Sequence, residues 1–176
     1  FKIQAVTAES AGVQITSATN NGTTEYTIAV TFTNQYATGT AFVDLSGSKE
    51  LLGDSLSEYT GDDGFAFTLY SAVADADGKV QKGTLIHTAH LNAEGRFIFD
   101  HNTIDDLIFD QTGTYHFIVE EAVVGNDPLM IFDDTYYEVT VEITDNMAGE
   151  LLAETTVTMV KDGQRRTVAV NGLNFS

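Results

Sequence analysis

The sequence predicts an all-β fold, a two-layer antiparallel sandwich, on three observations. Apolar and polar residues alternate with a period of two along several short segments, which is the pattern of strands that bury one face. Glycine-containing turn sequences separate these segments, as they do between antiparallel strands. A helical period is missing apart from one expected turn around 103–107. We therefore expect at least about seven strands between residues 40 and 176, with no helix longer than about two turns.

The expected strands follow one another along the chain, and each shows the same alternation. They are 26–32, 64–69, 96–99, 114–119 and 137–143. The connectors supply the turns. Their sequences are Asn-Asn-Gly at 20–22, Asp-Asp-Gly at 62–64, Asp-Gly at 77–78, Glu-Gly at 94–95, Thr-Gly at 112–113 and Asp-Gly at 162–163.

An internal repeat divides the chain into two parts. Residues 27–36 (Thr-Ile-Ala-Val-Thr-Phe-Thr-Asn-Gln-Tyr) align without a gap on residues 167–176 (Thr-Val-Ala-Val-Asn-Gly-Leu-Asn-Phe-Ser), and such self-similarity indicates repeated modules. Each copy is interpreted as the closing strand of a module. We expect residues 1–36 to be the closing strands of a preceding module or a short N-terminal β segment, and residues 40–176 to be one complete module.

Charge and composition exclude several classes of function. The formal net charge is -18 over 176 residues, and this field repels phosphate backbones and anionic lipid headgroups, so we expect neither nucleic acid nor a membrane as partner. Neither an apolar run of about 18 residues nor a signal peptide is expected within this stretch. A nucleophile elbow, a phosphate loop and a dinucleotide fingerprint are absent from the sequence, which predicts a protein that is not an enzyme. Cysteine is also absent, which raises the question of what replaces the disulfides that often stabilise extracellular modules of this size.

Three polar residues break the alternation because they fall on the apolar face of a strand. Lys49 shares the face of the apolar residues that precede it at every second position. Glu121, and not its neighbour Glu120, continues the apolar face of its own strand. On the last strand Asn174 shares a face with Val168 and Val170. Since alternate residues of a strand point to opposite sides, we expect Lys49, Glu121 and Asn174 to point inward.

Five pieces of the chain occur in the order of a known family's motifs. They are 47–53 (Gly-Ser-Lys-Glu-Leu-Leu-Gly), 65–69 (Phe-Ala-Phe-Thr-Leu), 113–121 (Gly-Thr-Tyr-His-Phe-Ile-Val-Glu-Glu), 132–141 (Phe-Asp-Asp-Thr-Tyr-Tyr-Glu-Val-Thr-Val) and the closing Asn. Together they resemble the streptococcal-type pilin isopeptide-linkage domain of Gram-positive pilins and adhesins, over about residues 40–176. The stretch 32–36 (Phe-Thr-Asn-Gln-Tyr) is the better match to the family's closing Phe-x-Asn-x-Tyr and supports a preceding module.

The resemblance implies an Ig-like β-sandwich with an intramolecular isopeptide crosslink. Lys49 and Asn174 inherit the roles of the two linked residues, and Glu121 that of the carboxyl that assists the reaction. Asn171 is the alternative partner for Lys49, because the family has an aromatic residue where this chain has Gly172, and Asn171-Gly172 is itself a turn sequence.

The chemistry explains why these residue types are needed. Burial disfavours the charged form of Lys49 and so favours a nucleophilic amine. A carboxyl group in the same pocket, that of Glu121, polarises the asparagine amide and passes a proton to the departing ammonia. An ordinary salt bridge between Lys49 and Glu121 is the main alternative, and a lysine whose charged end snorkels to solvent is another.

Metal and cofactor sites are not expected. The segment 75–78 (Asp-Ala-Asp-Gly) resembles the opening of a calcium loop, but it lacks the later acidic ligand and is interpreted as a hairpin turn. The four histidines, His87, His90, His101 and His116, are scattered along the sequence and lack the companions of a zinc site.

Two functions from different classes remain open. The first is a structural module in the shaft or stalk of a Gram-positive pilin or adhesin, extracellular and anchored to the cell wall, whose partners are neighbouring modules. The second is a ligand-binding adhesin domain that holds a host glycan or protein in its end loops.

Overall fold

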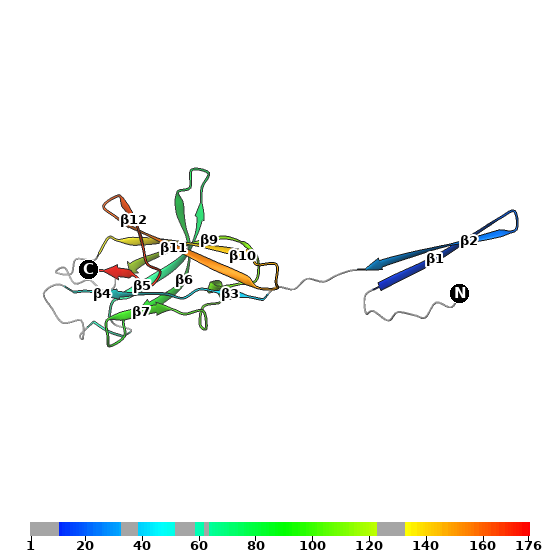
Figure 1. Ribbon diagram of the computed structural model, residues 1–176. Coiled ribbons are helices and arrows are strands. Elements are labelled where there is room, and N and C mark those ends of the chain that lie inside the picture. The colour runs from blue at the N-terminus through cyan, green and yellow to red at the C-terminus, as the bar shows by residue number, and fades with distance from the viewer. Residues whose placement is uncertain (1–10, 33–38, 52–58, 62–63, 123–132) are drawn as a thin grey trace. The chain divides into compact units, whose positions relative to one another are not determined.

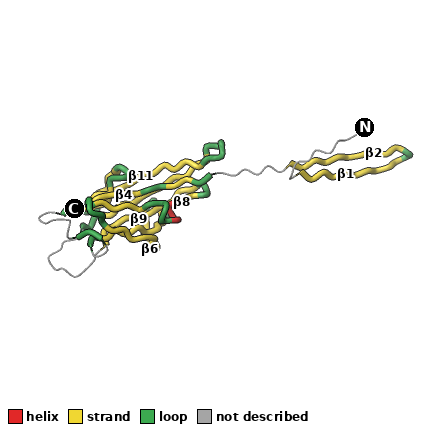
Figure 2. The backbone as a smooth tube through the Cα atoms, turned by 90° about the horizontal axis from the view of Figure 1, so that it is seen from below, coloured by secondary structure: helices red, strands yellow, loops and turns green. Residues whose placement is uncertain are grey.

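The computed structural model describes residues 11–32, 39–51, 59–61, 64–122 and 133–176 (Figure 1). By its internal contacts the chain separates into two compact units, Phe1–Ala37 and Thr38–Ser176. Strands account for most of the described chain, as Figure 2 shows, and its described residues contain no α-helix. The predicted all-β class is therefore confirmed. Within the same residues, no helix is long and apolar enough to span a membrane.

The first unit contains one antiparallel hairpin. Strand β1 (Ala11–Asn20) pairs with β2 (Thr23–Phe32) over their whole length. The two residues between them, Asn21 and Gly22, have φ angles of 50° and 78°. These left-handed conformations are those of a two-residue hairpin turn, in which Asn-Gly is the favoured sequence.

The second unit is a sandwich built from a six-stranded sheet and a three-stranded sheet. The six-stranded sheet is antiparallel and has the order β12-β11-β10-β9-β5-β6, and the smaller sheet has the order β13-β4-β7. Two short strands, β3 and β8, pair with each other and form a separate two-stranded sheet. A 3-10 turn, η2, lies within the predicted segment 103–107. The bounds are β3 Ala41–Phe42, β4 Leu45–Lys49, β5 Ala66–Ala74, β6 Val80–His90, β7 Arg96–Phe99, η2 Asp105–Leu107, β8 Ile108–Phe109, β9 Gly113–Ala122, β10 Tyr136–Asp145, β11 Leu151–Lys161, β12 Gln164–Val168 and β13 Leu173–Phe175.

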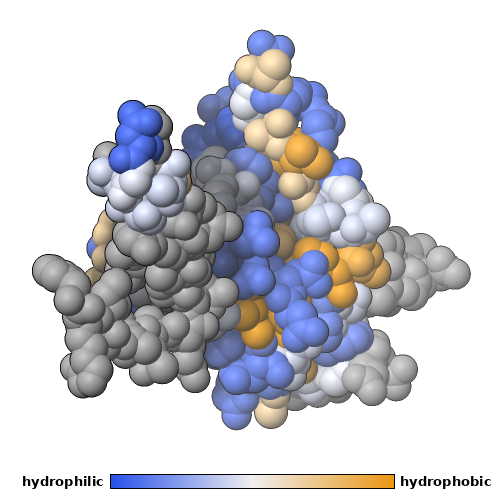
Figure 3. Space-filling model, turned by 90° about the vertical axis from the view of Figure 1, so that its right-hand side faces the viewer, coloured by the Kyte–Doolittle hydropathy of each residue, from blue (hydrophilic) through white to orange (hydrophobic). Residues whose placement is uncertain are grey.

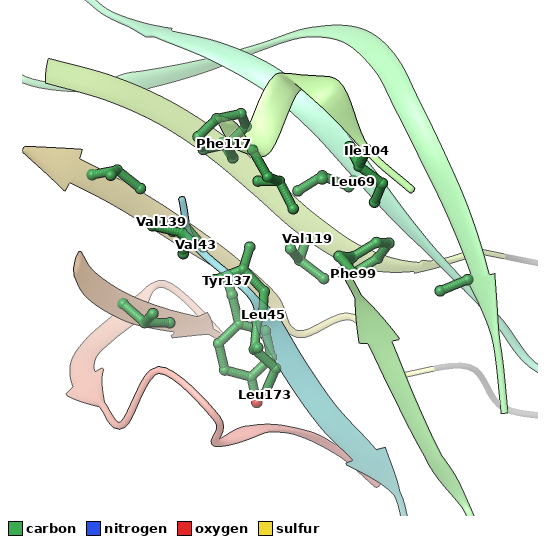
Figure 4. Close-up of a cluster of buried hydrophobic side chains, with 14 of the residues drawn as sticks. Val43, Leu45, Leu69, Phe99, Ile104, Phe117, Val119, Tyr137, Val139 and Leu173 are labelled. Carbon is green, nitrogen blue, oxygen red and sulfur yellow. The ribbon is translucent and has the colours of Figure 1, made fainter. Parts of the chain in front are cut away.

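The hydrophobic core lies between the two sheets. Figure 4 shows side chains from both layers directed toward one another, among them Leu45 from β4, Val119 from β9 and Tyr137 from β10. Farther along the core, the rings of Phe67 and Phe97 stack with their centroids 4.0 Å apart. In β4, β7 and β13 the more buried residues occupy every second position, which is the period-two pattern visible in the sequence.

The opening and closing strands of this unit lie side by side. β4 pairs with β13 in parallel, with Gly47 opposite Leu173 and Lys49 opposite Phe175. A β-carbon on Gly47 would lie 1.9 Å from the Leu173 carbonyl oxygen, so the absence of a side chain permits this close pairing. Lys49 is thereby placed directly beside the end of the closing strand.

The predicted continuity of the last strand is wrong. β12 ends at Val168 on the edge of the large sheet, and β13 begins at Leu173 in the small sheet. Between them the chain turns, and the Gly172 amide donates to the Ala169 carbonyl over 2.9 Å. Because the chain changes sheets at this turn, the face of Val168 does not continue to Asn174. The gap-free alignment of the repeat therefore matches part of β2, which is one continuous strand, to a segment that a turn divides between β12 and β13.

Candidate functional site

Lys49 is buried at the end of β4, as its position on the apolar face predicted. Its side chain is only 2% exposed. Leu45 and Gly47 precede it on the same inner face, while Ser46 and Ser48 alternate with them on the other. The Nζ atom lies 5.0 Å from the centre of the Phe65 ring, so the amine is bordered by an aromatic face.

Glu121 meets Lys49 across the sandwich. It lies on β9 in the large sheet, continues the inner face of Val119, and has a side chain that is 0% exposed. Its Oε2 atom is 3.1 Å from Lys49 Nζ. The same oxygen accepts a second hydrogen bond, 3.0 Å long, from the Asp133 backbone amide. The structure thus brings together two of the three residues that the sequence predicted to point inward.

The neighbouring glutamate points the other way. Glu120 binds Lys82 on the outer surface, with 2.8 Å between Oε1 and Nζ. Both of these side chains are partly exposed, so their ion pair contributes little to stability. The outward position predicted for Glu120 is confirmed, which makes it a matched control for Glu121.

One oxygen of the buried carboxylate has no partner in the described part of the chain. Glu121 Oε1 is shielded from solvent and accepts no hydrogen bond there. An unsatisfied buried acceptor costs about 1–3 kcal/mol, and such groups occur where a reacting partner has still to bind. An amide N–H or an O–H placed beside Oε1 would satisfy it.

Asn174 does not reach this pair, and the prediction that it points inward is wrong. Its side chain is exposed, and its Oδ1 accepts a hydrogen bond from Ser48 Oγ over 2.9 Å on the outer face of the small sheet. The inward residues of β13 are Leu173 and Phe175. Asn171 lies exposed in the turn before β13. Neither candidate acceptor is brought to Lys49, and Asn34 lies outside the described residues.

Asp133 is a buried residue of the site that the sequence did not predict, with a side chain that is 2% exposed. Its Oδ1 accepts from the Thr135 amide at 2.9 Å, from the Thr135 hydroxyl at 2.5 Å and from Lys161 Nζ at 3.2 Å. Its Oδ2 accepts from the Ser176 amide at 2.7 Å. An Asp two residues before a Thr is a recognisable turn signal, but its partners on distant strands leave no local signature.

These contacts hold Asp133 in its ionised form. Burial raises its pKa, but hydrogen bonds from the Thr135 hydroxyl, the Ser176 and Thr135 amides and Lys161 outweigh burial and lower the pKa to about 2. An aspartate in an unfolded chain titrates near 3.9. The ionised form therefore stabilises the fold above about pH 4, and this contribution is lost as the pH falls through about 2.

We expect this loss of stability to depend on Asp133 and to disappear in Asp133→Asn. The comparison is made between two proteins that both carry Lys49→Ala, so that neither can form the crosslink, and only one of them carries Asp133→Asn. The difference in unfolding free energy, measured with urea, should shrink as the pH falls from 5 to 2, by on the order of 1 kcal/mol after screening by solvent. Other carboxylates cancel in the comparison. A difference that stays constant over this range would contradict the proposed charge state.

The segment 75–78, which resembles the opening of a calcium loop, forms a turn. Asp75 Oδ1 accepts from the Asp77 and Lys79 amides in the hairpin between β5 and β6, which is the turn interpretation of this segment. Of the described residues, three possible ligands cluster, Asp44, Asp100 and His101, and His101 is hydrogen-bonded to Asp44 through both its amide and its ring.

Comparison with known proteins agrees with this architecture. A search of curated proteins finds no match to the chain. A family model described as "FctA: Spy0128-like isopeptide containing domain" matches residues 45–175, a span from the first residue of β4 to the last residue of β13. The chain therefore belongs to the FctA family of Spy0128-like isopeptide-containing domains.

Proposed function

We propose that residues 38–176 form a load-bearing module in the shaft or stalk of a Gram-positive surface protein, closed by an amide bond from Lys49. The observation that carries this proposal is the fully buried pair of Lys49 Nζ and Glu121 Oε2, 3.1 Å apart, beside the closing strand. Removing two charges from water is costly, and a buried ion pair is by itself weak evidence for added stability. A chemical use of the pair accounts for its burial.

The reaction we infer is the exchange of one amide for another. Moving a proton from Lys49 Nζ to the Glu121 carboxylate leaves a neutral amine and a neutral acid, the forms that a low-dielectric pocket tolerates best. The amine attacks the carbonyl carbon of an asparagine carboxamide. Its new C–N bond replaces the bond to the amide nitrogen, which takes a proton through Glu121 and leaves as ammonia. The attacking nitrogen passes its second proton to Glu121, which therefore ends as the neutral acid, and the carboxylate is restored when ammonia carries this proton away as ammonium.

We assign the acceptor to the next inward position of the closing strand, two residues after Phe175. Phe175 is opposite Lys49 in the parallel register and faces the core, and residues two apart share a face. The Glu50 amide donates to the Phe175 carbonyl over 2.8 Å, so pairing continues to the end of the described strand. In the first unit an asparagine, Asn34, stands two residues after Phe32. With Phe32 aligned on Phe175, the position of Asn34 corresponds to the position after Ser176, and we propose an asparagine there.

The experiment compares two chains by intact mass after folding. One is the present sequence, and the other continues it after Ser176 with Asn-Gln-Tyr, the residues that follow Phe32-Thr33 in the first unit. We expect the continued chain to lose the mass of one ammonia and the present chain to keep its full mass. Loss from the present chain, with a link to Asn174 or Asn171, would overturn the acceptor assignment. Full mass in both would overturn the crosslinking function.

The surface gives less support to the alternative of a ligand-binding adhesin domain. On the face drawn in Figure 3, hydrophilic residues surround and separate the hydrophobic ones. The large apolar side chains exposed among the described residues come from several elements; they are Phe42, Val73, Leu85, Ile98, Ile108, Met147 and Leu152. An interface core concentrates such residues. We therefore place the module in a shaft or stalk, where its partners are neighbouring modules of the same surface chain.

A further inference from the structure

Asp133 contacts both of the elements that the crosslinking reaction must bring together. It lies just before β10 and touches residues from three other strands or their ends. Its backbone amide donates to Glu121 Oε2 over 3.0 Å, and this is the oxygen that Lys49 also contacts. Asp133 therefore helps to fix the rotamer of the carboxyl group that relays the proton.

The side chain of Asp133 holds the closing strand. Its Oδ2 accepts from the Ser176 amide over 2.7 Å, immediately after the last residue of β13. In the proposed function the acceptor is the next residue along the strand, so this hydrogen bond fixes the backbone one residue before it.

The carboxylate is itself held rigidly in place. Thr135 donates to Oδ1 through its amide and its hydroxyl, and Lys161 adds a third donor. Thr135 is buried, at 2% exposure. A group with its rotamer locked in this way can position a reacting partner to a fraction of an ångström.

We propose that Asp133 is the positioning residue of the crosslinking reaction: one arm orients the Glu121 carboxyl and the other orients the strand that delivers the acceptor to Lys49. This inference rests on the proposed function and adds a residue to it. Asp133 touches neither reacting atom. Its contribution is to the geometry, and a displacement of about 1 Å at a reacting centre can cost on the order of a hundredfold in rate.

The test measures the rate of crosslinking in newly made chains. The chain continued with Asn-Gln-Tyr is synthesised in a cell-free system, quenched in denaturant at intervals, and its loss of ammonia is followed by mass. We expect Asp133→Ala to slow the reaction at least about tenfold at a temperature where circular dichroism shows the variant fully folded. Asp133→Asn, which keeps one oxygen for the Ser176 amide, should recover part of that rate.

Two controls separate positioning from stability. Asp134 is exposed beside Asp133, so Asp134→Ala should crosslink at the unaltered rate. Thr135→Val removes one donor to Asp133 Oδ1 and should slow the reaction less than Asp133→Ala, which keeps the proposal testable if the alanine variant does not fold. The same substitutions in a Lys49→Ala background give their cost in stability alone.

The outcomes distinguish this inference from the function on which it rests. Folded Asp133→Ala that crosslinks at the unaltered rate would overturn the positioning role while leaving the crosslink intact. The positioning role would also be overturned if the crosslinking rate of every variant, Asp134→Ala included, fell only in proportion to its loss of stability. If the unsubstituted continued chain forms no crosslink, the proposed function itself fails.

Discussion

Lys49→Ala is expected to lower the melting temperature of the crosslinked module by more than about 10 °C. The proposed amide would close a loop of roughly 130 residues, and by the chain-entropy relation established for disulfides such a closure contributes on the order of 5 kcal/mol. A module of this size shifts by about 3 to 5 °C per kcal/mol. Differential scanning calorimetry gives the melting temperature, and limited proteolysis should show the variant cleaved where the parent is resistant.

The control for this variant leaves the buried pair unchanged. Lys49→Ala removes the amide, but in the folded variant it also leaves Glu121 buried without its ion partner, which has a cost of its own. Replacing the acceptor asparagine by alanine removes the amide alone, because Lys49 and Glu121 stay 3.1 Å apart. Both variants should melt well below the parent. If the variant that lacks the acceptor asparagine has the same melting temperature as the parent, the bond contributes no stability.

The same variants are expected to differ from the parent under tension. Force that enters along β4 reaches Lys49, crosses the amide and leaves through the residue after Ser176, so the chain between them carries no load. Without the amide, the load falls on the parallel pairing of β4 with β13. In single-molecule pulling, the parent should stay closed, whereas Lys49→Ala should extend by the length of the released chain.

Glu121→Gln is expected to fold and to remain uncrosslinked. Glutamine keeps the shape of the side chain and an oxygen for the Asp133 amide, but it cannot take the proton from Lys49 or return it to ammonia. General acid-base catalysis of this kind contributes about a hundredfold to ten-thousandfold. Intact mass after overnight folding should therefore be the full mass, against a loss of one ammonia in the parent.

Glu120→Ala is the matched comparison for this prediction. Glu120 is the adjacent residue on the same strand, but it binds Lys82 on the outer surface. Its removal should leave the extent of crosslinking unchanged. Equal crosslinking in Glu121→Gln and Glu120→Ala would remove the buried carboxyl group from the mechanism.

Local alternation was enough to find half of the site. Lys49 and Glu121 lie at the ends of regular strands, β4 and β9, and in a regular strand the parity of a residue fixes the side to which it points. The apolar residues before each of them identified the inner side. Strand parity gives the orientation of each side chain but does not show which strands face each other. The contact between Lys49 and Glu121 could therefore be anticipated only from the family resemblance.

The same reasoning failed for Asn174 because parity does not pass through a turn. The residues 169–172 carry the chain from one sheet to the other, and a shift of a single residue exchanges the two faces of a strand. Phe175, opposite Lys49, is the inward residue that fixes the register. The gap-free alignment of the repeat matched Phe32 to Gly172, and only the pairing of β13 with β4 shows that Phe175 is the inward residue beside Lys49.

Asp133 could not have been found from sequence, although its turn could. Its contacts with Thr135 are local, but those with Glu121 and Ser176 span 12 and 43 residues. Its role arises from the meeting of three strands, a property of the tertiary structure. The hydrogen bonds that lower its pKa come from the same meeting.

Peptide mapping of the folded, continued chain tests the central claim most directly. Trypsin cleaves after an unmodified lysine, so it should fail to cleave after Lys49, and tandem mass spectrometry should show the Lys49 peptide joined to the peptide that contains Ser176 and the asparagine after it. A Lys49 that is cleaved normally, in a protein whose two peptides are recovered separately, would contradict the account.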